Sequence, residues 1–163
     1  MLTRDACRIA VQNTLVCLFG YLGGYYLTTL FRIPGAALGG LWALVSGIIV
    51  LQATRRETWA SAWLRLLGTS IGAVISGVYL FLLPFSPLGM ALTIGVTVLL
   101  CQFIDIPDHA RLAALTVAII MVVASLHPGI NPVVNALLRF IETCIGTALA
   151  VVAVVLWPEP TRA

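Results

Sequence analysis

The sequence contains no lysine and little charge of either sign. Charged residues make up 9% of its 163 residues, and all nine basic side chains are arginine. Because soluble domains carry roughly 25% charged residues, this composition excludes an ordinary water-soluble fold. The net charge of +3 is too small to indicate nucleic-acid binding, and we expect it to report membrane orientation instead.

Cysteine and histidine are also scarce. The four cysteines are scattered without a CxxC pair, and only two histidines are present. This pattern argues against a disulfide framework and against a metal centre. The fingerprints of serine hydrolases, zinc peptidases, Walker-type proteins and dinucleotide-binding proteins are absent from the sequence. We therefore expect a protein that is not an enzyme and that holds no metal or cofactor.

Long apolar runs dominate what is present. Hydrophobic residues make up 61% of the chain, and a run of about 18 or more is typical of a membrane-spanning helix. The sequence therefore predicts an all-α membrane protein, a single transmembrane domain over residues 1–163 with no extramembrane domain. Six candidate spans use almost the entire chain: about 11–30, 34–53, 59–83, 87–104, 110–127 and 132–157.

The arginines are divided unevenly between the two sides of this predicted bundle. Seven lie on the side that holds both termini, and only Arg32 and Arg139 lie on the other. Arginine-rich loops of membrane proteins face the cytoplasm. Both termini are therefore predicted to be cytoplasmic.

A segment of the third predicted helix recurs in the sixth. Residues 65–72 (RLLGTSIG) correspond to residues 139–146 (RFIETCIG), at an offset of 74 positions that also relates Pro84 to Pro158. The repeat units, at about 10–84 and 85–158, each hold three predicted helices. Because three is odd, the second unit enters the membrane from the opposite side, which predicts two inverted three-helix repeats.

Small residues are spaced for close helix packing in lipid. Pairs four positions apart let two helix backbones approach each other. These pairs are Gly20 and Gly24, Gly35 and Gly39, Gly68 and Gly72, and, more weakly, Gly146 and Ala150. We interpret them as packing positions inside the bundle, with a contact between two copies through the first or second helix as the alternative.

The repeated segment also carries the predicted substrate-binding residues. Arg65 and Thr69 share one face of the third helix, and Arg139 and Thr143 share the equivalent face of the sixth. A polar face on an apolar helix is expected to line the bundle interior or a watery cavity. We predict that these four residues bind a small anion. The alternative for Arg65 is that its guanidinium reaches the lipid headgroups.

Glu142 is the main chemical difference between the two copies, since it stands where the first copy has Gly68. It is the only acidic residue far inside a predicted span, and Arg139 precedes it by three positions. Side chains at this spacing can pair on a helix, and such a pair is either purely structural or part of a proton pathway. We predict Glu142 as the proton-coupling residue.

Two motifs within residues 41–72 carry a resemblance to a known family. An apolar helix opens with Trp42 and Ala43 and has Gln52 near its end, and Arg-x-x-Gly-Thr-x-x-Gly follows from Arg65. This arrangement resembles the fusaric acid resistance superfamily, which includes the aromatic acid exporters and, more distantly, the plant aluminium-activated malate channels. The resemblance implies a transporter in the bacterial inner membrane that exports small organic anions, often aromatic carboxylates.

The resemblance also bears on partners. Larger relatives carry a soluble domain or two membrane units, whereas this sequence shows one minimal six-span unit. We therefore expect a homodimer in the lipid bilayer, with a periplasmic adaptor as a further candidate partner. Two other functions stay open: an organic-anion channel, and a non-transporting membrane subunit that assembles an efflux complex.

Overall fold

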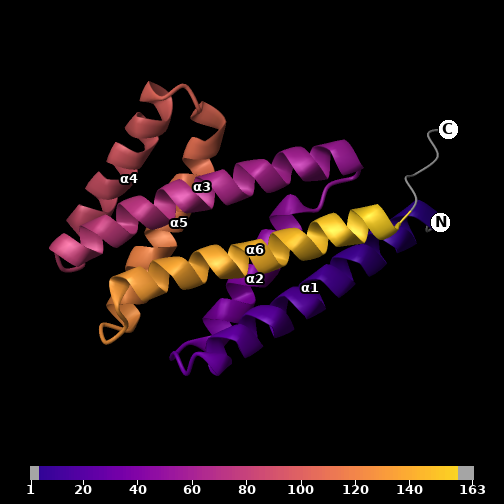
Figure 1. Ribbon diagram of the computed structural model, residues 1–163. Coiled ribbons are helices and arrows are strands. Elements are labelled where there is room, and N and C mark those ends of the chain that lie inside the picture. Colours follow the sequence, from indigo (N-terminus) through magenta and orange to yellow (C-terminus); the bar gives the residue numbers. More distant parts are fainter. Residues whose placement is uncertain (1–3, 158–163) are drawn as a thin grey trace. The chain divides into compact units, whose positions relative to one another are not determined.

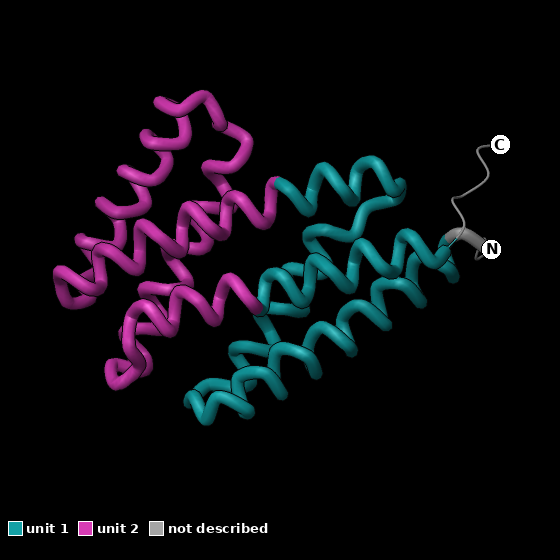
Figure 2. Tube along the Cα trace, viewed as in Figure 1, with its two compact units in different colours: residues 1–63, 142–163 teal, residues 64–141 magenta. Residues whose placement is uncertain are grey.

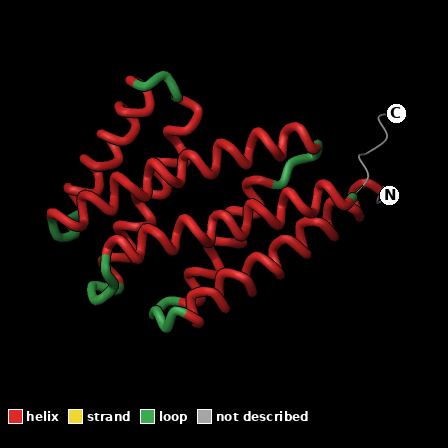
Figure 3. Tube along the Cα trace, viewed as in Figure 1, coloured by secondary structure: helices red, strands yellow, loops and turns green. Residues whose placement is uncertain are grey.

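The computed structural model consists of α-helices joined by short loops (Figures 1 and 3). The helices are α1 (Arg4–Leu30), α2 (Ala36–Val50), α3 (Arg55–Leu82), α4 (Pro87–Phe103), α5 (Pro107–Leu126) and α6 (Pro132–Leu156). The structure describes residues 4–157, and side chains from residue 6 onward. Pro158, Arg162 and the Arg4 side chain, used in the repeat and orientation predictions, lie outside the described part. The all-α prediction is confirmed, and each predicted span overlaps one helix.

The helices differ in their ability to cross a membrane. Within the described residues, α3, α5 and α6 are long and apolar enough to do so. The other apolar helices, α2 with 15 residues and α4 with 17, are shorter than the roughly 20 residues of a typical crossing. In α1, polar residues such as Gln12 and Asn13 interrupt the apolar run. The number of crossings therefore stays a prediction.

Local chemistry sets where several helices begin. Three of them open with a proline, whose missing N–H group is not needed at that position. These prolines are Pro87, Pro107 and Pro132. Ser86 Oγ accepts a hydrogen bond from the Gly89 amide at 3.0 Å, and Asn131 Oδ1 accepts one from the Val133 amide at 2.9 Å. These caps satisfy N–H groups that have no partner within the helix.

Packing divides the chain into two units (Figure 2). Unit 1 comprises residues 1–63 and 142–163, and unit 2 comprises residues 64–141. Helices α1 and α2 belong to unit 1, α4 and α5 belong to unit 2, and α3 and α6 each contribute to both. These units are defined by contacts between residues, whereas the repeat units at about 10–84 and 85–158 are defined by sequence similarity. The inverted arrangement of the repeats stays a prediction.

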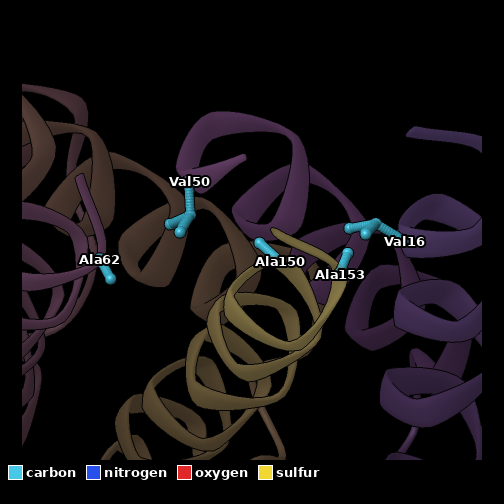
Figure 4. Close-up of a cluster of buried hydrophobic side chains, with 5 residues drawn as sticks. All are labelled: Val16, Val50, Ala62, Ala150 and Ala153. Carbon is cyan, nitrogen blue, oxygen red and sulfur yellow. The ribbon is translucent and has the colours of Figure 1, made fainter. Parts of the chain in front are cut away.

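Small side chains form the core of unit 1, in which α1 packs against α2. One buried cluster draws on α1, α2, α3 and α6 (Figure 4) and consists of Val16, Val50, Ala62, Ala150 and Ala153. Three of these five residues are alanine, which allows the helix backbones to come close together.

Unit 2 is organised around α5, which packs against α4. Two buried clusters hold the unit together, one joining α5 to α3 and α6 and the other joining it to α4. Their buried members are Ala73, Ile120 and Ala136 in the first cluster, and Cys101, Ala110 and Ala113 in the second.

Candidate functional site

The five residues predicted to bind substrate or couple protons are all buried. They are Arg65, Thr69, Arg139, Glu142 and Thr143, and none is more than 3% exposed. The full burial of Arg65 argues against a side chain that reaches the headgroups, because such a guanidinium keeps an exposed tip. Charged groups are costly in apolar surroundings, so the buried arginines and Glu142 need polar partners.

The buried polar residues are distributed over the two units. Glu142 and Thr143 belong to unit 1, together with α1 and α2, whereas Arg65, Thr69 and Arg139 belong to unit 2. The site residues of unit 1 and those of unit 2 therefore have different packing partners.

Glu142 contacts a threonine of α1 that is distant in sequence. Thr28 Oγ1 lies 3.0 Å from Glu142 Oε1 and also 3.0 Å from the carbonyl oxygen of Gly24. Thr28 and Glu142 are both 0% exposed. A hydroxyl carries one proton, so Thr28 can donate a full hydrogen bond to only one of these two oxygens at a time.

Glycines of α1 and α2 make room for this contact. A Cβ atom on Gly39 would lie 2.5 Å from Glu142 Oε1 and would also collide with Thr28 Oγ1. A Cβ atom on Gly24 would collide with the Gly39 carbonyl oxygen. Three helices, α1, α2 and α6, therefore meet at Glu142 because these two positions lack side chains.

The next residues of α6 lie against α2. Ser46 Oγ is 3.5 Å from Thr143 Oγ1, at the outer limit of a hydrogen bond, and donates to the Trp42 carbonyl at 2.8 Å. A Cβ atom on Gly146 would collide with the Ala43 carbonyl oxygen and would lie 2.8 Å from the Gly47 nitrogen. Gly146 therefore sets the close approach of α6 to α2.

In unit 2, the residues around Thr69 lie against α5. A Cβ atom on Gly68 would lie 2.7 Å from Leu112 Cβ, and one on Gly72 would lie 2.5 Å from the Ala113 carbonyl oxygen. The buried Thr69 hydroxyl has no hydrogen-bond partner among the described residues. Its proton is therefore not committed to another described residue.

Arg139 lies on the part of α6 that belongs to unit 2. One turn earlier on that helix, Asn135 Nδ2 donates to the Ile120 carbonyl of α5 at 3.0 Å. Asn135 is 1% exposed, so this buried bond holds α6 against α5 one turn before Arg139.

Gly35 differs from the other predicted packing glycines. It precedes α2 with φ 91°, in the left-handed region, and its carbonyl accepts a hydrogen bond from the Gly39 amide at 3.2 Å. Glycine adopts this conformation without strain, whereas side chains other than those of Asn and Asp rarely do. Its role in the structure is to start α2.

No sequence pattern points to Thr28 or Ser46 as site residues. Thr28 is followed by Thr29, and no local pattern distinguishes the buried hydroxyl from the exposed one. The sequence predicts Gly24 only as a packing residue, although it also supplies the carbonyl that competes with Glu142 for the Thr28 proton.

The described residues offer little to a metal ion. They contain no group of three or more histidine, cysteine or acidic side chains that would hold one, and the four cysteines are free. The buried site residues instead carry guanidinium, hydroxyl and carboxylate groups, which form hydrogen bonds suited to small polar ions.

Comparison with known proteins places the chain in a family. It is 29% identical over 153 residues to the inner membrane protein YccS of Escherichia coli (strain K12), an alignment that covers 93% of the chain and 20% of YccS. The chain thus spans about a fifth of the length of this curated relative. No solved structure matches the chain. Residues 15–153 match the family described as fusaric acid resistance protein-like. Because this match covers most of a chain rich in apolar helices, the protein is a multi-pass membrane protein that belongs to the fusaric acid resistance protein-like family, as its Trp42, Gln52 and Arg65 motifs predicted.

Proposed function

We propose that the protein exports small organic anions, in particular aromatic carboxylates, across the bacterial inner membrane. The observation that carries this proposal is the burial of Arg65 and Arg139 in helices of a membrane protein. Intramembrane charges are costly and commonly mark substrate or ion pathways. A guanidinium group recognises a carboxylate through paired hydrogen bonds, and the hydroxyls of Thr69 and Thr143 would add further donors.

The location and direction of transport rest on the comparisons. The relative YccS is described as an inner membrane protein, which supports the same membrane for this chain. The family description refers to resistance, which supports outward movement of the substrate.

The membrane arrangement that goes with this function has six crossings, cytoplasmic termini and two inverted halves that rock to give alternating access. Two copies would form the working transporter, with a periplasmic adaptor as a candidate partner. Cys7 is exposed near the start of α1, so it should react with a membrane-impermeant maleimide only after cells are opened. Labelling of Cys7 in intact cells, with Cys7→Ser as the control, would contradict cytoplasmic termini.

The Thr28 contact supports proton coupling through Glu142. When Glu142 is protonated, its carboxyl group donates to Thr28 Oγ1, and Thr28 donates to the Gly24 carbonyl. When Glu142 is ionised, the Thr28 proton turns to the carboxylate, and the bond to Gly24 is weakened. Loss or gain of one proton therefore reverses the direction of the hydrogen bond between α6 and α1.

The titratable residues beside Glu142 on α6 are Arg139, three positions before it, and Cys144, two positions after it. Helix α2 contains no titratable residue. The nearest titratable residues along α1 are Tyr25 and Tyr26, followed by Tyr21, which contacts Gly40. Glu142 is therefore the proposed site of proton binding in this part of unit 1.

Transport into proteoliposomes tests the proposal. Uptake of a panel of aromatic and aliphatic carboxylates should be measured with and without a pH gradient. We expect Arg139→Ala to lower aromatic carboxylate uptake about tenfold or more, because removing one charged hydrogen-bonding partner costs several kcal/mol. Arg139→Lys keeps the charge but not the paired donors, and should retain part of the uptake.

The matched control is Arg111→Ala, which removes an exposed arginine of α5. Wild-type uptake is expected for this variant. The proposal fails if wild type moves no carboxylate, or if Arg139→Ala transports as well as Arg111→Ala. Electrogenic uptake that ignores the pH gradient would identify a channel, and a complete lack of uptake would favour the non-transporting subunit.

A further inference from the structure

We infer that a cavity at the start of α1 binds a phosphate-type oxyanion, and that this site is separate from the proposed transport residues. The cavity has a volume of about 170 Å³, enough for more than one water-sized group. It is lined by Arg8, Ile9, Gln12 and Asn13 of α1 and by Leu51, Gln52 and Ala53, which follow α2. All of these residues belong to unit 1.

Arg8 supplies the charge of this cavity. Its Nε atom is buried and has no hydrogen-bond partner among the described residues. Arg8 is the only charged residue among those that line the cavity. A buried guanidinium donor is costly to leave unsatisfied, and the planar group matches the geometry of a phosphate oxyanion.

Three amide side chains supply the other polar groups of the lining. Gln12 is 5% exposed and donates to the Ala153 carbonyl of α6 at 3.4 Å. Asn13 donates to the Ile9 carbonyl and Gln52 to the Ile49 carbonyl, each at 2.9 Å. Since every amide NH₂ group has two donors, each amide has a second N–H that these bonds do not use. The cavity thus combines one cation with several neutral donors held in place by backbone contacts.

The position of the cavity favours a lipid headgroup as the source of the oxyanion. The start of α1 meets α6 through Gln12, and the start of α3 meets α6 where Arg55 donates to the Val155 carbonyl at 3.0 Å. These contacts gather arginines at one end of unit 1, the end predicted to face the cytoplasm. Arginine-rich ends of membrane helices attract anionic lipids. Gln12 lies 16 positions before Thr28, about 24 Å along the helix, so the cavity is distinct from the Glu142 contact.

Thermal unfolding of the purified full chain in a neutral detergent tests the inference. The probes are short-chain phosphatidylglycerol, a diacylglycerol that lacks the phosphate, and inorganic phosphate. We expect saturating phosphatidylglycerol to raise Tm by roughly 5 °C and diacylglycerol to have no effect. Arg8→Gln should abolish most of this shift and weaken binding about tenfold. Arg56→Gln, which removes an exposed arginine outside the cavity, should leave the shift unchanged.

A shift with phosphatidylglycerol alone, dependent on Arg8, supports a lipid phosphate. A shift with inorganic phosphate that also depends on Arg8 supports a free oxyanion. Asn13→Asp provides a second variant in case Arg8→Gln does not fold, since it keeps the arginine and places a carboxylate in the cavity. The inference is overturned if no probe raises Tm, if Arg8→Gln responds like Arg56→Gln, or if Asn13→Asp retains the shift.

Discussion

Thr28 of α1 and Glu142 of α6 are 114 positions apart in sequence, yet the threonine Oγ1 lies 3.0 Å from the glutamate Oε1 in the structure. Both side chains are fully buried, and the threonine stands at the same distance from the Gly24 carbonyl. Through Thr28, a carboxyl group of α6 is thus linked to the backbone of α1.

Replacement of Thr28 by valine keeps the shape of the side chain and removes the hydroxyl. We expect Thr28→Val to lower the free energy of unfolding by about 0.6 kcal/mol, the average measured for hydrogen bonds between membrane helices, and by no more than the maximum of about 1.7 kcal/mol. Under the proposed function, it should also reduce the response of uptake to a pH gradient. Thr29→Val is the control, because Thr29 is exposed and donates only locally, to the Tyr25 carbonyl. Equal unfolding curves for the two variants in mixed micelles would show that the Thr28 hydroxyl contributes nothing.

Replacement of Glu142 by glutamine tests the carboxyl group itself. The amide retains the size of the side chain and its ability to bond to Thr28 but cannot bind a proton. We expect Glu142→Gln to remain folded and to give uptake that no longer depends on a pH gradient. Glu57→Gln, at the exposed start of α3, should behave like wild type. If uptake by Glu142→Gln still depends on the pH gradient, Glu142 does not couple protons to transport.

Two glycine-to-alanine variants are expected to have opposite effects. A methyl group on Gly39 collides with Thr28 and Glu142, so Gly39→Ala should destabilise the protein by about 1–3 kcal/mol. In α4, a Cβ atom on Gly95 meets nothing within 4 Å. Gly95→Ala should therefore be neutral or stabilising by up to about 1 kcal/mol, because alanine is the better helix former. Unfolding of both variants in mixed micelles measures the difference, and a stable Gly39→Ala protein would contradict the close approach of α2.

The packing of α3 against α5 is tested within unit 2. A methyl group on Gly72 would lie 2.5 Å from the Ala113 carbonyl oxygen, and a backbone atom cannot move aside as a flexible side chain can. We expect Gly72→Ala to cost about 1–3 kcal/mol of unfolding free energy. Gly77→Ala on the same helix is the control, since its Cβ would meet Ala136 Cβ at an ordinary 3.5 Å. If the two variants unfold alike, α3 and α5 do not approach each other as closely as the structure shows.

The length of α2 differs from the length that hydropathy predicts. The apolar stretch at about 34–53 is predicted to be a full span, yet α2 contains only 15 residues. Gly35 precedes it in a left-handed conformation, and Leu51 leaves the helix with φ −67° and ψ 114°. The hydropathy of the sequence does not mark either end of α2, because glycine and leucine are both common in apolar runs.

The sequence by itself determined the helical class, the approximate extent of six helices and the family. These properties follow from local features: long apolar runs, prolines at helix starts, and motifs of fixed spacing around Trp42 and Arg65. Such features act between residues that are close along the chain, so they can be read without knowing how the helices pack.

Only the tertiary structure decided which polar groups meet. It placed Thr28 rather than Thr29 against Glu142, and it buried Arg65 completely. It also brought Arg8 into one cavity with Gln52. These outcomes depend on the rotation of each helix about its axis and on how closely two backbones approach. In this chain, that approach is controlled by glycines such as Gly39 and Gly146, where a single methyl group would not fit.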